Sequence, residues 1–286
     1  MLGPRIIFGA AEDIEKTEQP IPQEIAPPYA EIVKMSPRAS RWYEFMMQES
    51  QRPNFEGWLR SRFCEQYALP GRSLAGAKFA LEPVSQITDG GLLVPVFEFR
   101  RQRHYQSFLR RTDLSLVQGT TLALDVEEDM RPLSIVFVCA EYIRGHLEPR
   151  QIKRHEKIHA TDPLIYERKT SDAPALNELI AVIGEVTDPE GDLLTVDSIP
   201  GFWRQVFRDV SRFSPSLMKI LATGKKTEYP IDELVSSMCQ FVKDITRNRS
   251  NRQVVRMIMS CRDFDELIAK LYQVYPEIFK SEGLVD

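Results

Sequence analysis

The sequence predicts an α+β fold in which a small, mostly antiparallel sheet is flanked by helices and followed by a helical C-terminal part. Strand signals concentrate between residues 69 and 138, where apolar residues alternate with polar ones or form short runs between turns. Before and after this region, apolar residues recur every three or four positions, which is the spacing of one helix face. The 286 residues, 43% of them hydrophobic, suffice for one large domain or two ordinary ones.

The first segment of the chain, residues 1–38, is predicted to be an extended or disordered arm because residues 12–38 are rich in Pro, Glu and Gln. Such an arm is either a plain tail or a segment that binds a partner or covers a cleft. The apolar run near its start is too short for a signal peptide, so we expect a cytoplasmic protein. No stretch reaches the run of about 18 apolar residues that a membrane span requires.

Two helices are predicted over residues 40–67, with a break at Pro53-Asn54 and with their aromatic residues in the core. Strands follow wherever β-branched and aromatic residues gather between turn signals. These strands are predicted at residues 91–99, 114–117, 121–126 and 133–138. Together with the motif segment described below, they form a predicted α+β domain over residues 39–187.

A basic run, Arg100–Arg111, separates two of these strands. We interpret it as a solvated helix or turn rather than a nucleic-acid surface, because the net charge of the chain is −4. The four cysteines are far apart and have no C-x-x-C spacing, which favours buried free thiols. Residues 188–286 keep helical spacing and form either a second domain or an extension of the first.

The motif His155-Glu156-Lys157-Ile158-His159 is the strongest chemical signal in the chain. Pro149 suits the first turn of a helix, and Asp162-Pro163 ends it, so the motif lies on a helix of about 12 residues. Histidines four apart share one helix face and can converge on one ion. In this pattern the histidines bind Zn2+ and the glutamate takes a proton from the attacking water. The Lys157 ammonium inside the motif would repel Zn2+ unless its stem carries the charge into solvent.

A third protein ligand is required, because two histidines and a water leave a tetrahedral zinc site incomplete. No histidine follows His159, so an acidic residue must serve. Glu178 is the best placed, since Asp172 and Pro174 begin a second predicted helix whose apolar residues keep helical spacing. This second helix would bring Glu178 to the metal.

These residues resemble the gluzincin type of zinc metallopeptidase. The similarity covers about residues 133–186 and consists of the motif, the connecting loop with Tyr166, and the helix that begins with Asn177-Glu178. It implies a zincin-like fold, Zn2+ as cofactor and a peptide or protein as substrate. It further implies that Glu156 is the general base and that Tyr166 lies near the reaction centre, where it can stabilise the oxyanion. The strand at 133–138 would border the cleft and pair with an extended peptide.

Two other classes of protein stay open at this point. A non-catalytic interaction or structural protein can carry a fortuitous H-E-x-x-H sequence, in which case His155 and His159 would point apart or into a dry core. A nucleic-acid-associated protein would use the Arg100–Arg111 run and show binding that falls steeply with salt.

Overall fold

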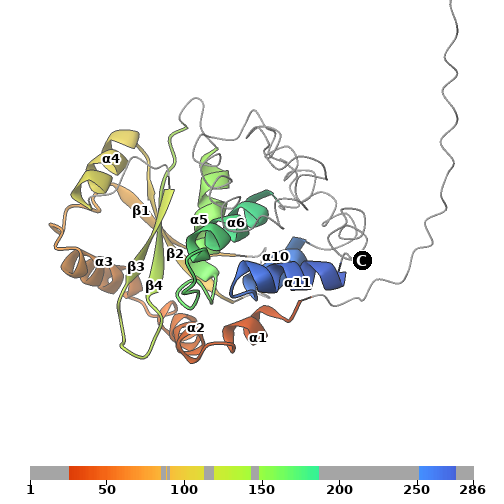
Figure 1. Ribbon diagram of the computed structural model, residues 1–286. Helices are drawn as coiled ribbons and strands as arrows, with labels where there is room; N and C mark the ends of the chain where they lie inside the picture. The colour runs from red at the N-terminus through yellow and green to blue at the C-terminus, as the bar shows by residue number, and fades with distance from the viewer. Residues whose placement is uncertain are drawn as a thin grey trace, which may run out of the picture.

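A computed structural model shows an α+β architecture, as the sequence predicts. The residues that it describes are 26–84, 88, 91–112, 119–142, 148–186 and 251–274. Figure 1 shows a small sheet with helices on both of its faces. None of the described helices is long and apolar enough to cross a membrane.

The sheet has four described strands in the order β1-β2-β4-β3. Their bounds are β1 (Ala77–Pro83), β2 (Leu93–Phe99), β3 (Gly119–Leu124) and β4 (Leu133–Cys139). The β1–β2 and β3–β4 pairs are antiparallel, whereas β2 and β4 run parallel. The sheet is therefore mixed rather than simply antiparallel. The individual predictions missed β1, and the strand predicted at 114–117 lies outside the described residues.

β4 lies inside the sheet, so the expectation that it borders a cleft is wrong. It pairs with β2 through Val136–Cys139 and with β3 through Leu133–Val138. All seven of its residues are buried. A strand that is apolar on both faces belongs in the middle of a covered sheet. Among the described strands, β3 takes the edge position on that side.

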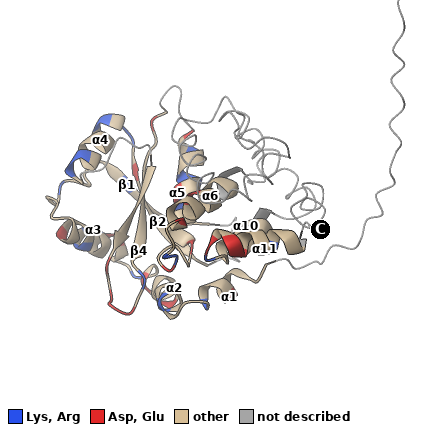
Figure 2. Ribbon diagram, viewed as in Figure 1, with Lys and Arg blue, Asp and Glu red and all other residues tan. Residues whose placement is uncertain are grey.

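The helices Phe55–Gln66 and Gln102–Arg111 cover one face of the sheet, where Phe63 and Phe108 contact Phe137. The predicted helix pair is confirmed as α2 (Pro37–Glu49) and α3 (Phe55–Gln66), and the basic run forms α4 (Gln102–Arg111). Figure 2 shows arginines along the outer side of α4, while its aromatic side is buried. The solvated-helix interpretation of Arg100–Arg111 thus matches the burial of its residues.

An aromatic cluster forms the core between this helical layer and the sheet. Phe137 of β4 stacks with Phe108 of α4 at 4.7 Å and lies 4.9 Å from Phe63 of α3, measured between ring centroids. Such pairs contribute about 0.5–1.5 kcal/mol each beyond the area that they bury. The prediction that the aromatics of residues 40–67 belong to the core is confirmed for Trp42, Phe55 and Phe63.

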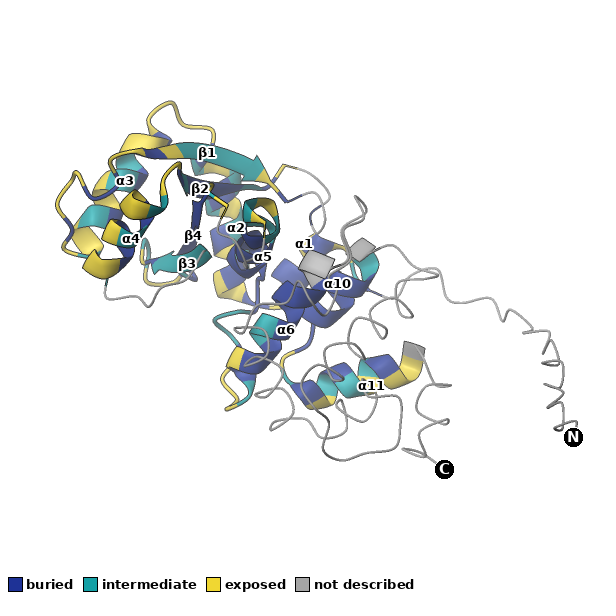
Figure 3. Ribbon diagram, turned by 90° about the horizontal axis from the view of Figure 1, so that it is seen from above, coloured by how far each residue is buried: buried dark blue, intermediate teal, exposed yellow. Residues whose placement is uncertain are grey.

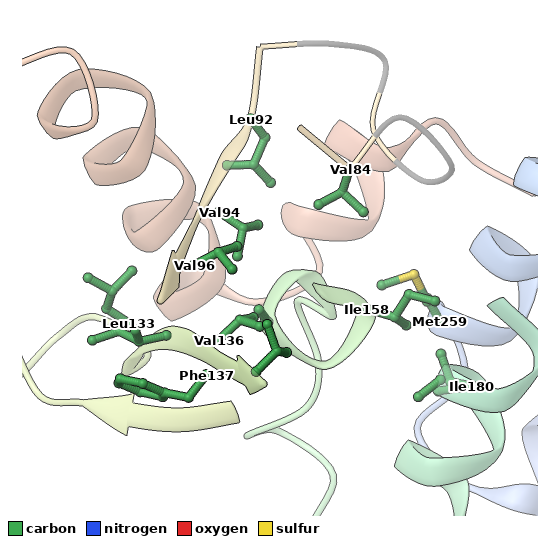
Figure 4. Packing of buried hydrophobic residues seen from close by; sticks show 14 of the residues in the cluster. Val84, Leu92, Val94, Val96, Leu133, Val136, Phe137, Ile158, Ile180 and Met259 are labelled. Carbon is green, nitrogen blue, oxygen red and sulfur yellow. The ribbon is translucent and has the colours of Figure 1, made fainter. Parts of the chain in front are cut away.

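The opposite face of the sheet is covered by α5 (Pro149–Thr161), and α6 (Ala173–Val186) packs on α5. Figure 4 shows Val136 of β4 facing α5, with Ile158 of α5 near Met259 and Ile180 on the far side. Met259 belongs to α10 (Asn251–Met259). Figure 3 shows that α10 is almost wholly buried, in contrast to the exposed outer sides of α3 and α4. The sheet and the motif helix therefore share one core.

Both ends of the described chain join that core. Tyr29 and Val33 of α1 (Tyr29–Val33) are buried in it, so the predicted arm ends earlier than residue 38; residues 1–25 lie outside the described part. Leu267 and Leu271 of α11 (Phe264–Val274) are buried there too. The other helices predicted within 188–286 lie outside the described residues. Cys64, Cys139 and Cys261 are free thiols, as predicted; Cys139 and Cys261 are buried, whereas Cys64 is half-buried.

Candidate metal centre

The helix that carries the motif begins and ends where the sequence predicts. Pro149 takes its first position, and the backbone N–H of Glu148 donates to Gln151 Oε1 at 3.1 Å. Asp162 follows the last helical residue, and its Oδ1 accepts from the backbone N–H of Leu164 at 3.0 Å, which starts the turn that leaves the helix. These local bonds fix the length of α5, so that the two histidines lie in its second half.

The three predicted ligands come together. The Nε2 atoms of His155 and His159 are 3.1 Å apart. Glu178 of α6 places one carboxylate oxygen 3.5 Å from His155 Nε2 and the other 3.4 Å from His159 Nε2. In a tetrahedron with metal–ligand bonds of about 2.05 Å, neighbouring ligand atoms are about 3.3 Å apart. One ligand atom from each of the three residues lies within 4.8 Å of the others, so the group could hold a single metal ion.

The pKa shifts inside the cluster come from its neighbouring charges, which outweigh the effect of burial. Burial alone would lower the pKa of His159, but the carboxylates of Glu178 and Glu156 outweigh it and raise that pKa to about 9. Burial would likewise raise the pKa of Glu178, and the two histidines instead hold it well below its usual range. Without metal, the cluster is thus an ion pair between Glu178 and a protonated His159.

Glu156 lies between this cluster and the edge strand. Only 8% of the residue is exposed. Its Oε2 accepts a hydrogen bond of 2.8 Å from Thr121 Oγ1 of β3. Burial raises the pKa of Glu156, although the nearby His155 and His159 and the bond from Thr121 act in the opposite direction. The carboxyl group is therefore better able to take up a proton than an exposed glutamate.

The stem of Lys157 does not carry its charge into solvent. Its side chain is 11% exposed, and its Nζ lies 3.3 Å from Glu82 Oε2 of β1. Lys153, one turn earlier, bridges Glu82 and Glu98 at 2.9 and 2.7 Å. Two residues along a helix correspond to a rotation of about 200°, so Lys157 leaves α5 on the side away from His155. Its charge is offset by Glu82 rather than by water.

Tyr166 is held at the end of the sheet instead of in the cluster. Its hydroxyl lies 3.1 Å from Ser134 Oγ of β4, and the Arg131 guanidinium lies 5.3 Å from its ring centroid. Among the contacts of the described residues, none joins Tyr166 to the three ligands. The structure thus brings together four of the five residues predicted for the site.

A buried arginine braces the end of α5. Arg131 donates from Nη2 to the backbone oxygen of Ala160 at 2.8 Å and from Nη1 to that of Asp162. Its guanidinium carbon lies 3.9 Å from the centroid of the Trp42 ring. The last carbonyl groups of a helix have no partner within the helix. Arg131 satisfies two such groups at the end of α5 and fixes the turn that follows His159.

A second buried arginine connects the two ligand helices to α10. Arg168 donates to the side chains of Asp162, at the end of α5, and Asn177, next to Glu178. The same guanidinium donates to the backbone oxygens of Met259 and Cys261, at 2.8 and 2.9 Å. One side chain thus fixes α6 relative to α5 and α10.

Sequence reasoning missed Thr121, Gly119 and the two arginines. The only local sign of the first two was the Gly119-x-Thr121 spacing, which places both side chains on one face of a strand. Comparison of the chain with protein-family models, curated proteins and solved structures gives no match. Any chemistry assigned to the site therefore rests on its own residues.

Proposed function

We propose that the protein is a zinc-dependent hydrolase of peptide bonds, with a zincin-like arrangement of sheet and ligand helices. One observation carries the proposal. Three groups with the chemistry of zinc ligands lie 3.1–3.5 Å from one another, and a buried glutamate follows the first of them in the chain. Catalytic zinc sites with two histidines and one glutamate keep a fourth position for water or substrate.

In the proposed reaction each residue of the site would have its own role. His155, His159 and Glu178 would hold the ion, which when bound lowers the pKa of a water molecule and polarises a carbonyl group. Glu156 would take a proton from the attacking water and pass it to the leaving amine. Tyr166 would stabilise the oxyanion only if its hydroxyl exchanged Ser134 for the substrate.

The edge of the sheet suits an extended peptide. β3 is the described edge strand nearest α5, and its Thr121 touches Glu156. An exposed strand edge offers unpaired backbone N–H and C=O groups, to which an extended chain can add as a further strand. We propose that the substrate pairs along β3, which takes the role expected of the strand at 133–138.

The alternative of a fortuitous motif in an interaction protein predicts histidines that point apart or into a dry core. The 3.1 Å separation of the two Nε2 atoms, and the charged group of Glu178 beside both, argue against that alternative. This supports the zinc hydrolase over a binding module.

Metal content and turnover of four proteins test the proposal. We expect the wild type, Glu156→Gln and the control His104→Ala to hold one zinc per chain by elemental analysis; His104 is exposed on α4. The His155→Ala, His159→Ala double variant should hold none. Glu156→Gln should lose turnover of labelled casein by about 10²–10⁴-fold, the usual contribution of a general base. A wild type without zinc after reconstitution, or a fully active Glu156→Gln, would refute the function.

A further inference from the structure

The edge strand β3 supports Glu156 with two residues that point to the same side. We propose that Gly119 and Thr121 form a cradle that fixes the orientation of the Glu156 carboxylate, with Thr121 as a positioning residue. This inference rests on the proposed role of Glu156 as the general base. We call these two residues the β3 cradle.

The first half of the cradle is the Thr121 hydroxyl. Its Oγ1 lies 2.8 Å from Glu156 Oε2 and 3.0 Å from the backbone oxygen of Glu156. A hydroxyl has one proton to donate, and a carboxylate is the stronger acceptor of the two. The branched side chain of threonine has restricted rotation about χ1, so the donor holds its position. Thr121 thereby fixes the carboxylate of Glu156.

The second half is the missing side chain of Gly119. A Cβ atom at this position would lie 2.4 Å from Ile152 Cγ2, 2.8 Å from Glu156 Cγ and 3.0 Å from Glu156 Oε1. Real side chains do not approach this closely, so only glycine lets Glu156 lie flat against the strand. Residues two apart in a strand face the same side, which explains why Gly119 and Thr121 act on one glutamate.

The consequence for catalysis follows from the two oxygens of the carboxylate. Thr121 holds Oε2, so the cradle leaves Oε1, above Gly119, as the oxygen that takes the proton. A glutamate side chain has three rotatable bonds, and holding one oxygen limits them before the substrate arrives. Positioning a catalytic group in advance reduces the entropy that the reaction step must lose.

The contact is tested first in the metal-free protein, where no activity is needed. We expect Thr121→Val to lower the midpoint of urea unfolding by about 1 M, the effect of one lost hydrogen bond to a charged group at a slope of about 2 kcal/mol per molar urea. In a Glu156→Leu background, which keeps only the backbone oxygen of residue 156 as an acceptor, the same change should have a clearly smaller effect. The control Thr112→Val removes a hydroxyl that donates within α4, and its effect should be the same in both backgrounds.

The role is then tested in the zinc-loaded full-length protein, with labelled casein as the substrate. Thr121→Val should keep one zinc per chain and an unchanged KM, while kcat falls about tenfold or more. Thr121→Ser, which restores the donor, should recover most of the turnover.

The outcomes separate the cradle from the proposed function. Equal effects of Thr121→Val in the two backgrounds would overturn the cradle, whatever the activity. If the effect of Thr121→Val on stability depends on Glu156 but kcat is unchanged, the positioning role of Thr121 is overturned. A zinc-loaded wild type that cleaves neither casein nor a mixed library of quenched peptides would refute the hydrolase itself, and the cradle would then have no catalytic role.

Discussion

Replacing Gly119 by alanine tests how closely β3 packs on the motif helix. Carbon atoms in ordinary contact are about 3.5–4.0 Å apart. The added Cβ would lie 2.4 Å from Ile152 Cγ2 and 2.8 Å from Glu156 Cγ, so strand and helix must separate by about 1 Å. Overpacking of this kind costs about 1–3 kcal/mol. We therefore expect Gly119→Ala to destabilise the fold and to move Glu156 away from Thr121.

Urea unfolding of the metal-free protein measures this cost. With a slope of about 2 kcal/mol per molar urea, the midpoint should fall by about 0.5–1.5 M. The matched control is Gly71→Ala, because a Cβ at Gly71 meets nothing within 4 Å. Alanine there should leave the midpoint unchanged or raise it slightly, since it reduces the entropy of the unfolded chain.

Equal midpoints for the two alanine variants would refute the packing argument. They would mean that β3 moves away from α5 at no cost, and that the short distances at Gly119 do not constrain Glu156. A lowered midpoint with retained zinc and reduced turnover would instead connect the packing at Gly119 to the chemistry.

Two further predictions concern protonation and the brace at the end of α5. His159 has a pKa of about 9 without metal, above its unfolded value, so its pairing stabilises the apo protein fully below about pH 6.5 and is lost as the pH rises through 9. Zinc must displace that proton, so the apparent affinity of the protein for zinc should rise about tenfold per pH unit between 6.5 and 8.5. Competition with a chelator measures this affinity, and a value that does not change with pH would contradict the prediction. Arg131→Met should lower the free energy of unfolding in urea by about 3 kcal/mol, because it leaves buried backbone oxygens without a donor. Arg103→Met, at an exposed position, should lower it by less than about 0.5 kcal/mol. Equal losses would refute the brace.

The motif helix could be predicted because all of its signals are local. Pro149 and Asp162 set its ends, and the spacing of the two histidines sets their common face. Glu178 could be found because a second helix follows at short range and supplies the missing ligand type. Short-range patterns therefore yielded the three residues that converge.

The residues that hold the site in place could not be predicted in the same way. Thr121 and Glu156 are 35 residues apart, and their contact depends on where β3 lies beside α5. The partner of Lys157, Glu82, could not be found either, because it comes from a strand 75 residues earlier that was not predicted. Such contacts follow from strand order, which no local pattern determines.

The interior position of β4 in the sheet could have been predicted from the sequence. Residues 133–139 are apolar at every position except Ser134, and such a run is typical of a strand covered on both faces. The expectation taken from the family resemblance assigned this strand to the border of the cleft, and the burial pattern contradicts it.

The hydrogen bonds of Arg168 determine how short a fragment of the chain can be while keeping the candidate site. A chain that stopped after Val186 would keep every predicted ligand, yet it would lose Met259 and Cys261, whose backbone oxygens accept from this fully buried guanidinium. The charge would then lie at the junction of the ligand helices with half of its acceptors missing, and water would have to enter beside Asn177. The smallest unit that folds with an intact candidate metal centre therefore extends at least through Cys261. In dissecting this protein, a fragment bounded by the H-E-x-x-H segment and its glutamate is the one to avoid.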